Sequence, residues 1–118
     1  MPYADGFLLV VPKKNLDAYK KLARKAGKIW REHGALEYRE CVADDLSQKG
    51  PGSFRNRVKP KRNEIVIFSW IVYKSRAHRD KVNQKVMADP RLAKLKPEDM
   101  PFDMRRMSWA GFQVLVDL

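Results

Sequence analysis

Hydrophobic residues are most concentrated in one ten-residue segment, 64–73. The segment is rich in β-branched and aromatic residues, which favour a β-strand. Because successive side chains of a strand point to opposite faces, apolar residues occupy both faces of this one. One face carries Ile65, Ile67 and Ile71, and the other carries Val66, Phe68, Trp70 and Val72. This pattern is typical of a central strand in a sheet that is covered on both sides.

Two elements are predicted before this strand. Residues 3–11 form a first strand that is apolar on both faces and is ended by Pro12. A helix is expected over 16–33, where apolar residues recur at intervals of three and four and bases fill the other positions. Asn15 is the expected N-cap of this helix, and Gly34 is expected to follow its last residue.

The remaining segments give weaker patterns. Residues 35–42 alternate apolar and charged side chains, which suits an edge strand. Residues 47–63 follow no period, carry six bases and no acid, and are expected to form a long basic loop. Ser75 is the predicted N-cap of a second helix that runs to about Ala88, and a last long strand is predicted over 106–118.

The predicted order of elements is β-α-β-β-α-β, which defines an α+β fold. Its natural solution is a ferredoxin-like, four-stranded antiparallel sheet with two helices on one face and the first and third strands at its centre. The whole chain, 1–118, is expected to be one domain. Two helices cover only one face of the sheet, so we expect the other, aromatic-rich face to meet a second copy of the chain in a homodimer.

Composition limits the class of protein further. The 118 residues carry a formal net charge of +11, which favours anionic partners. Cys41 is the only cysteine, so an internal disulfide is excluded. The longest apolar run near the N-terminus, Phe7–Val11, is too short for a signal peptide or a membrane span, so a cytoplasmic protein without membrane partners is expected.

Six blocks of sequence resemble the YbaA-like bacterial domain of unknown function, family 1428. They are YADGF at 3–7, GALEYREC at 34–41, FSWIVYKSRAHRD at 68–80, MADPR at 87–91, MPFD at 100–103 and RMSWAGF at 106–112. The resemblance implies the dimeric α/β-barrel superfamily, in which small-molecule sites lie between the sheet and its helices. It implies no established activity.

Three polar residues are candidates for acid–base chemistry, namely Glu40, His33 and Tyr38. His33 ends the first helix close to carboxylates and is either a general base or a cation favoured at a helix C-terminus. By alternation, Glu40 shares a strand face with apolar side chains, where burial would raise the pKa of its carboxyl. The alternative is that a base, Arg105 or Arg106 or one from a dimer partner, pairs with Glu40.

Further residues are expected to line the same ligand pocket. Trp30, Phe68 and Trp70 supply aromatic walls, and Arg105 is a candidate for holding an anionic group of the ligand. The ligand is predicted to be a small organic molecule, bound either without turnover or by a cofactor-independent enzyme of the monooxygenase or isomerase kind. No pair of His or Cys has metal-ligand spacing, so neither a metal nor a cofactor is expected.

Binding of RNA or another polyanion is the alternative function. The bases of the 47–63 loop would act together with the outer face of the first helix through phosphate charge alone. The segment 64–73 lacks the basic-Gly-aromatic opening of an RNA-recognition strand. A third alternative is a structural or regulatory partner of another protein. The loop residues proposed for polyanion binding are Lys49, Arg55, Arg57, Lys59, Lys61 and Arg62.

Overall fold

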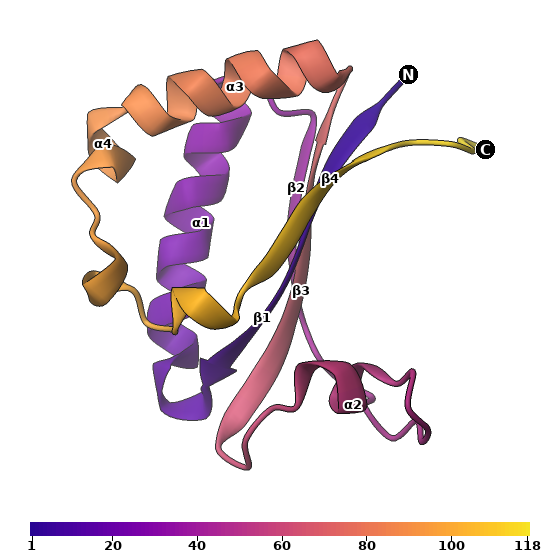
Figure 1. Ribbon diagram of the computed structural model, residues 1–118. Helices are drawn as coiled ribbons and strands as arrows, with labels where there is room; N and C mark the ends of the chain where they lie inside the picture. The colour runs from indigo at the N-terminus through magenta and orange to yellow at the C-terminus, as the bar shows by residue number, and fades with distance from the viewer.

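The computed structural model describes residues 1–118 as one sheet with two long helices packed on one of its faces (Figure 1). Its strands are β1 (Tyr3–Pro12), β2 (Glu37–Val42), β3 (Glu64–Tyr73) and β4 (Ser108–Gln113). Its helices are α1 (Leu16–Glu32), α2 (Phe54–Val58), α3 (Arg76–Ala88) and α4 (Pro90–Ala93). Short 3₁₀ turns occupy Lys13–Asn15, Pro97–Asp99 and Met104–Arg106.

The four strands are ordered β2-β3-β1-β4, and every neighbouring pair is antiparallel. The predicted α+β, ferredoxin-like fold is therefore confirmed, with the two doubly apolar strands at the centre of the sheet. The register between β1 and β3 pairs Leu9 with Ile67 and Val11 with Ile65. These four side chains point toward the helices, and Leu9 and Val11 are fully buried there.

The hydrophobic core lies between the sheet and the two long helices (Figure 1). α1 contributes Tyr19, Ala23 and Ile29, all on the apolar stripe that the sequence predicts. α3 contributes only Val82 and Val86, in keeping with its weaker pattern. Burial of these side chains is what holds the two helices on the sheet, at about 25 cal/mol for each Å² of apolar surface removed from water.

The helix boundaries follow the sequence with one exception. Ser75 caps α3 by accepting a hydrogen bond from the backbone N–H of His78, and Gly34 adopts a positive φ of 116° just after α1, as predicted. Asn15, the predicted cap of α1, caps nothing with its side chain. Its Nδ2 instead donates to the carbonyl of Pro101, because a 3₁₀ turn leads directly into the helix.

The basic segment 47–63 contains a short helix that the sequence pattern did not predict. Ser53 starts α2 by accepting from the N–H of Asn56. The Phe54 ring of α2 lies 6.2 Å, centroid to centroid, from that of Phe68, on the face of the sheet opposite α1 and α3. This aromatic contact helps to hold the loop against the sheet, a long-range effect that no local period reveals.

The last strand ends at Gln113 rather than at the predicted Leu118. β4 pairs only with β1, and in that register Gln113 lies opposite Tyr3, the first residue of β1. The N–H of Val114 still bonds to the carbonyl of Pro2, but no strand lies beyond it. The last residues therefore lead away from the sheet (Figure 1), and the side chains of Leu115, Val116 and Leu118 are exposed.

No helix of the chain combines the length and the apolar composition needed to cross a bilayer.

Candidate functional site

An apolar cavity of about 310 Å³ lies between the sheet and the helices. Strand β1 and helix α1 form two of its walls, and the irregular segment before β4 closes it with methionines. One polar corner, where β2 faces α1, holds Glu40. The lining residues are Phe7, Leu9, Tyr19, Leu22, Ala23, Ala26, Trp30, Tyr38, Glu40, Ser69, Ile71, Met87, Leu92, Leu95, Met100, Phe102, Met104 and Met107.

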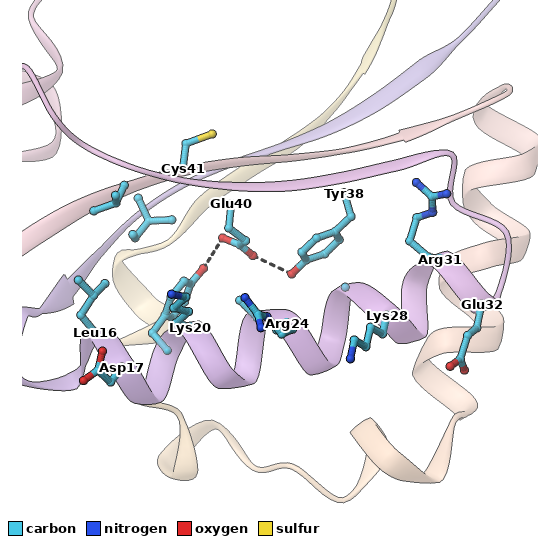
Figure 2. Close-up of a pocket in the computed structure, with 15 residues that line it drawn as sticks. Leu16, Asp17, Lys20, Arg24, Lys28, Arg31, Glu32, Tyr38, Glu40 and Cys41 are labelled. Atoms are coloured by element: carbon cyan, nitrogen blue, oxygen red, sulfur yellow. Dashed lines mark hydrogen bonds between the residues drawn. The ribbon is translucent and has the colours of Figure 1, made fainter.

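The Glu40 carboxylate is held by two tyrosine hydroxyls, as Figure 2 shows. Tyr19 of α1 donates to Oε1 and Tyr38 of β2 donates to Oε2, each at 2.7 Å. Glu40 makes no ion pair, although the chain has 25 Lys and Arg. A carboxylate offers about four acceptor positions, so two remain for a ligand.

Both tyrosines remain protonated donors. Burial raises the pKa of Tyr19 and of Tyr38 far above the usual value, and the negative charge of Glu40 raises both further. Neither tyrosine can therefore act as a base near neutral pH, which leaves the carboxyl of Glu40 as the candidate. The corner combines one candidate base with two fixed hydroxyl donors.

A glycine in α1 makes room for this arrangement. A Cβ at Gly27 would lie 2.6 Å from Cδ1 of Tyr38 and 2.7 Å from Cε1, well inside van der Waals contact. The Tyr38 ring therefore rests directly on the helix backbone, which places its hydroxyl at Glu40. Sequence reasoning missed both Gly27 and Tyr19; a glycine within a strong helical pattern was the available signal, since it usually has a packing reason.

Trp30 is one of the residues that line the cavity. Its ring lies 6.2 Å from that of Tyr38, and its Nε1–H donates to Oδ1 of Asn83 at 3.0 Å. The same Asn83 oxygen accepts a hydrogen bond from the buried hydroxyl of Tyr73. The indole N–H is thus satisfied by α3, and the ring contributes an apolar wall.

His33 does not reach the cavity. Its Nε2 lies 2.9 Å from Oδ2 of Asp89, at the corner between α3 and α4. Asp89 also accepts from the guanidinium and the backbone N–H of Arg91, and these bonds together with that of His33 hold the pKa of its carboxyl well below the usual range. The structure therefore places His33 in a contact that joins the end of α1 to the next helices.

Phe68 and Trp70 lie on the opposite face of the sheet from the cavity. Phe68 pairs in register with Leu8 and Cys41, away from α1, and its ring lies 5.7 Å from that of Trp70. The Nε1–H of Trp70 donates to Glu37 at 3.0 Å. The prediction that Phe68 and Trp70 line the same pocket as Trp30 and Tyr38 is therefore wrong. The alternation within 64–73 already places both rings on the face opposite the isoleucines.

Arg105 is also outside the cavity. Its side chain is 90% exposed and pairs with Asp103, while Arg106 pairs with Glu64. Neither base pairs with Glu40, so the alternative in which one of them neutralises Glu40 within the same chain is wrong. Tyrosine hydroxyls take that place because α1 presents Tyr19, not a base, to this part of β2.

Comparisons with known proteins identify the family. The family model described as "Protein of unknown function (DUF1428)" matches residues 2–104. The chain is 45% identical over 117 residues to the "Uncharacterized protein YbaA" of Escherichia coli strain K12 and to that of Shigella flexneri, covering 99% of this chain and of each relative. The chain belongs to the DUF1428 family. The resemblance predicted from six sequence blocks is confirmed.

Solved structures similar to this DUF1428 chain support the same fold. One is a crystal structure described as a dimeric ferredoxin-like protein from an uncultured marine organism, with a TM-score of 0.56, 14% identity and full coverage of both chains. Another is a de novo designed protein, with a TM-score of 0.51, 7% identity, and coverage of 97% of this chain and 99% of the other. At these identities the likeness shows the fold alone.

The bases proposed for polyanion binding are all exposed in this DUF1428 chain. None of them forms an ion pair, and they surround α2 at the end of the sheet where β3 begins. They are separate from the cavity. These residues are Lys49, Arg55, Arg57, Lys59, Lys61 and Arg62.

Proposed function

We propose that this protein is a homodimer in which each chain binds a small, mainly apolar organic molecule between its sheet and helices. The observation that carries the proposal is Glu40, a carboxylate without a cation partner in the wall of an otherwise apolar cavity. Leaving a charge in such a place costs stability unless it is well hydrogen-bonded. Binding of a ligand that donates hydrogen bonds to the free acceptor positions of Glu40 would explain why the chain keeps an unpaired carboxylate there.

The chemistry that suits the cavity is binding with one directional polar contact. The apolar walls contribute affinity, and Glu40 orients whichever ligand atom carries an N–H, an O–H or an acidic C–H. Abstraction of a proton by Glu40 would be the catalytic step of an isomerase-type or cofactor-independent monooxygenase-type reaction. Tyr19 and Tyr38 hold the carboxylate in place throughout, because their own hydroxyls stay protonated.

A fluorescent neutral amine, N-phenylnaphthylamine, tests the binding proposal. We expect saturable binding of one molecule per chain. Ala26→Phe, which fills the cavity, should weaken binding at least tenfold, whereas Ala18→Phe, the same change at an exposed position of α1, should not. Glu40→Gln should weaken binding roughly fivefold, since a hydrogen bond to a charged acceptor is about 1 kcal/mol stronger than one to a neutral acceptor.

Two results would remove the proposal. One is binding that never saturates. The other is an Ala26→Phe variant that remains folded by circular dichroism and binds the amine as tightly as the unchanged protein. Native mass spectrometry of protein purified through a high-salt wash complements the titration, because a stoichiometric adduct would identify the natural ligand by its mass.

The sheet face opposite α1 and α3 supports the homodimer. Phe68 and Phe112 are 43% and 59% exposed on this face, beside Trp70, and apolar patches of this kind usually mark an interface. The similar protein described as a dimer has the same fold. A second copy packed face to face would cover the aromatics and leave both cavities on the outside.

Sedimentation equilibrium at micromolar concentration tests the dimer. We expect twice the chain mass of 13.8 kDa. Phe112→Arg should shift the equilibrium to the monomer, and Trp109→Arg should not, because Trp109 is an equally exposed aromatic of β4 that points to the other face of the sheet. A monomer in the unchanged protein, or an equal effect of both variants, would disprove face-to-face pairing.

The six unpaired bases around α2 support polyanion binding as a second candidate function. Binding of a fluorescent duplex RNA should then fall steeply with salt, because each phosphate contact releases a counterion. Replacing Arg55, Arg57 and Lys59 by Gln should flatten that dependence. Neutral-ligand binding is expected to respond to neither change, so the two functions are separable.

A further inference from the structure

A second, larger hollow adjoins the cavity on the other side of Glu40. This groove, of about 870 Å³, is open to solvent. Apart from Ile67 of β3, the residues that line it come from α1 and β2, as Figure 2 shows. Its floor is apolar and includes Leu16, Ala23, Val42 and Ile67. Four residues line both the groove and the cavity, namely Tyr19, Ala23, Tyr38 and Glu40. The hydrogen-bonded group of Glu40 and its two tyrosines therefore lies where the groove and the cavity meet.

One rim of the groove carries a row of bases. Lys20, Arg24 and Lys28 follow one another at intervals of four along α1, which places them on one side of the helix, and all three line the groove (Figure 2). None of them forms an ion pair. Arg31 lies at the end of the row and donates to the carbonyl of Leu36.

The acids of the groove do not balance this row. Glu32 is already held by Arg91 at 2.7 Å, and Glu40 is held by the tyrosines. Asp17 is exposed at the far end and pairs with no base. Three cations thus remain free on the rim of a groove with an apolar floor, which is the arrangement that complements a molecule with an anionic end and an apolar body.

We propose that the natural ligand is an organic acid, with its anionic group at Lys20, Arg24 and Lys28 and its apolar body reaching past Tyr19 and Tyr38 toward the cavity. This inference rests on the proposed function and names the chemical class of its ligand. In this proposal the positive charge comes from these three bases and not from Arg105, which pairs with Asp103 outside the site. The middle of such a ligand passes Glu40, the one candidate base.

The bases should make an anion preferred over a neutral molecule of the same shape. Exposed ion pairs are individually weak, but three cations facing one anion at low salt are expected to give a preference of about tenfold. Anilinonaphthalene sulfonate and N-phenylnaphthylamine form a suitable probe pair, because they differ in the sulfonate group. We expect the sulfonate to bind about ten times more tightly at low salt and the difference to shrink as salt is added.

A matched pair of variants assigns the preference to the groove. Lys20→Gln, Arg24→Gln and Lys28→Gln together should abolish the preference for the sulfonate and leave binding of the neutral amine within about twofold. The control removes three charges elsewhere, by Lys14→Gln, Lys21→Gln and Lys25→Gln; these residues do not line the groove, and the preference should remain. Ala26→Phe should weaken both probes if they occupy the cavity.

Each other outcome has a definite meaning. The proposed anion site is disproved if the sulfonate binds no more tightly than the amine, or if both triple variants reduce the preference equally. In either case the proposal that the cavity binds a neutral ligand is unaffected. If neither probe binds saturably, the proposed function fails and the inference fails with it. If the groove bases affect binding of duplex RNA but not the preference between the probes, the row serves a polyanion and the inference is overturned.

Discussion

Gly27 lies in the middle of α1, where alanine would normally stabilise a helix. Replacing glycine by alanine inside a helix contributes about 1 kcal/mol. In this protein the added methyl group would meet three atoms of the Tyr38 ring at 2.6, 2.7 and 3.2 Å, where carbon atoms prefer about 3.5–4.0 Å. The ring would have to move by about 1 Å to relieve these contacts.

That displacement has two costs. Overpacking a well-filled site costs about 1–3 kcal/mol. Moving Tyr38 also lengthens its 2.7 Å hydrogen bond to Glu40, and a hydrogen bond to a charged group contributes about 1.5–3 kcal/mol. Against a helix gain of about 1 kcal/mol, we expect Gly27→Ala to destabilise the fold by about 3 kcal/mol net.

Urea unfolding followed by circular dichroism measures this change, at one fixed protein concentration because a dimer's stability depends on it. The decisive control is the same substitution in a Tyr38→Ala background. Without the ring, Gly27→Ala should stabilise by about 1 kcal/mol, so the sign of its effect reverses. A Gly27→Ala protein at least as stable as the unchanged one would refute the close packing of Tyr38 on α1.

Two further predictions concern charges outside the cavity. Asp5 is 3% exposed, and its Oδ1 lies 3.7 Å from the guanidinium of Arg79. Asp5→Ala should therefore destabilise the fold by about 3 kcal/mol in the same unfolding assay. The double variant with Arg79→Met should lose less stability than the sum of the two single changes. The pKa of Asp89 is depressed in the folded protein, so its ionised carboxylate stabilises the fold at pH values above the unfolded pKa of about 3.9. This stabilisation is lost progressively as the pH falls below that value. Asp89→Asn should therefore lower the melting temperature at pH 7 and reduce the fall in melting temperature below about pH 4. An unchanged Asp5→Ala midpoint, or an Asp89→Asn melting curve with the original acid slope, would contradict these assignments.

The fold could be predicted because its signals are local and agree with one another. The two segments with apolar residues on both faces became the central strands, and the strongest helical stripe became α1. Ser75 and Gly34 mark helix ends through their own side chain or backbone, so sequence alone located them. Where one element depends on a distant one, prediction failed: β4 stops at Gln113 because β1 starts at Tyr3, and α2 is held by Phe68.

The candidate site was only partly predictable for the same reason. Trp30, Tyr38 and Glu40 do line the cavity, because the alternation of β2 and the stripe of α1 both point inward. The partner of Glu40 could not be read from its own strand. Tyr19 lies 21 positions earlier and reaches it only after α1 has packed on the sheet. His33 was also a candidate from sequence, but its ring contacts Asp89 and does not line the cavity.

The choice of partners for Glu40 links the fold to the proposed function. The chain has 25 basic and 14 acidic residues, and four of the acids, Glu32, Glu37, Glu64 and Asp103, each pair with an arginine. Glu40 differs from these acids, because no cation pairs with it. Two tyrosines hold the carboxylate from opposite elements without neutralising it, so its charge remains available to whatever enters the cavity. The bases that could have neutralised it stand instead on the rim of the groove, where they are free to bind the ligand.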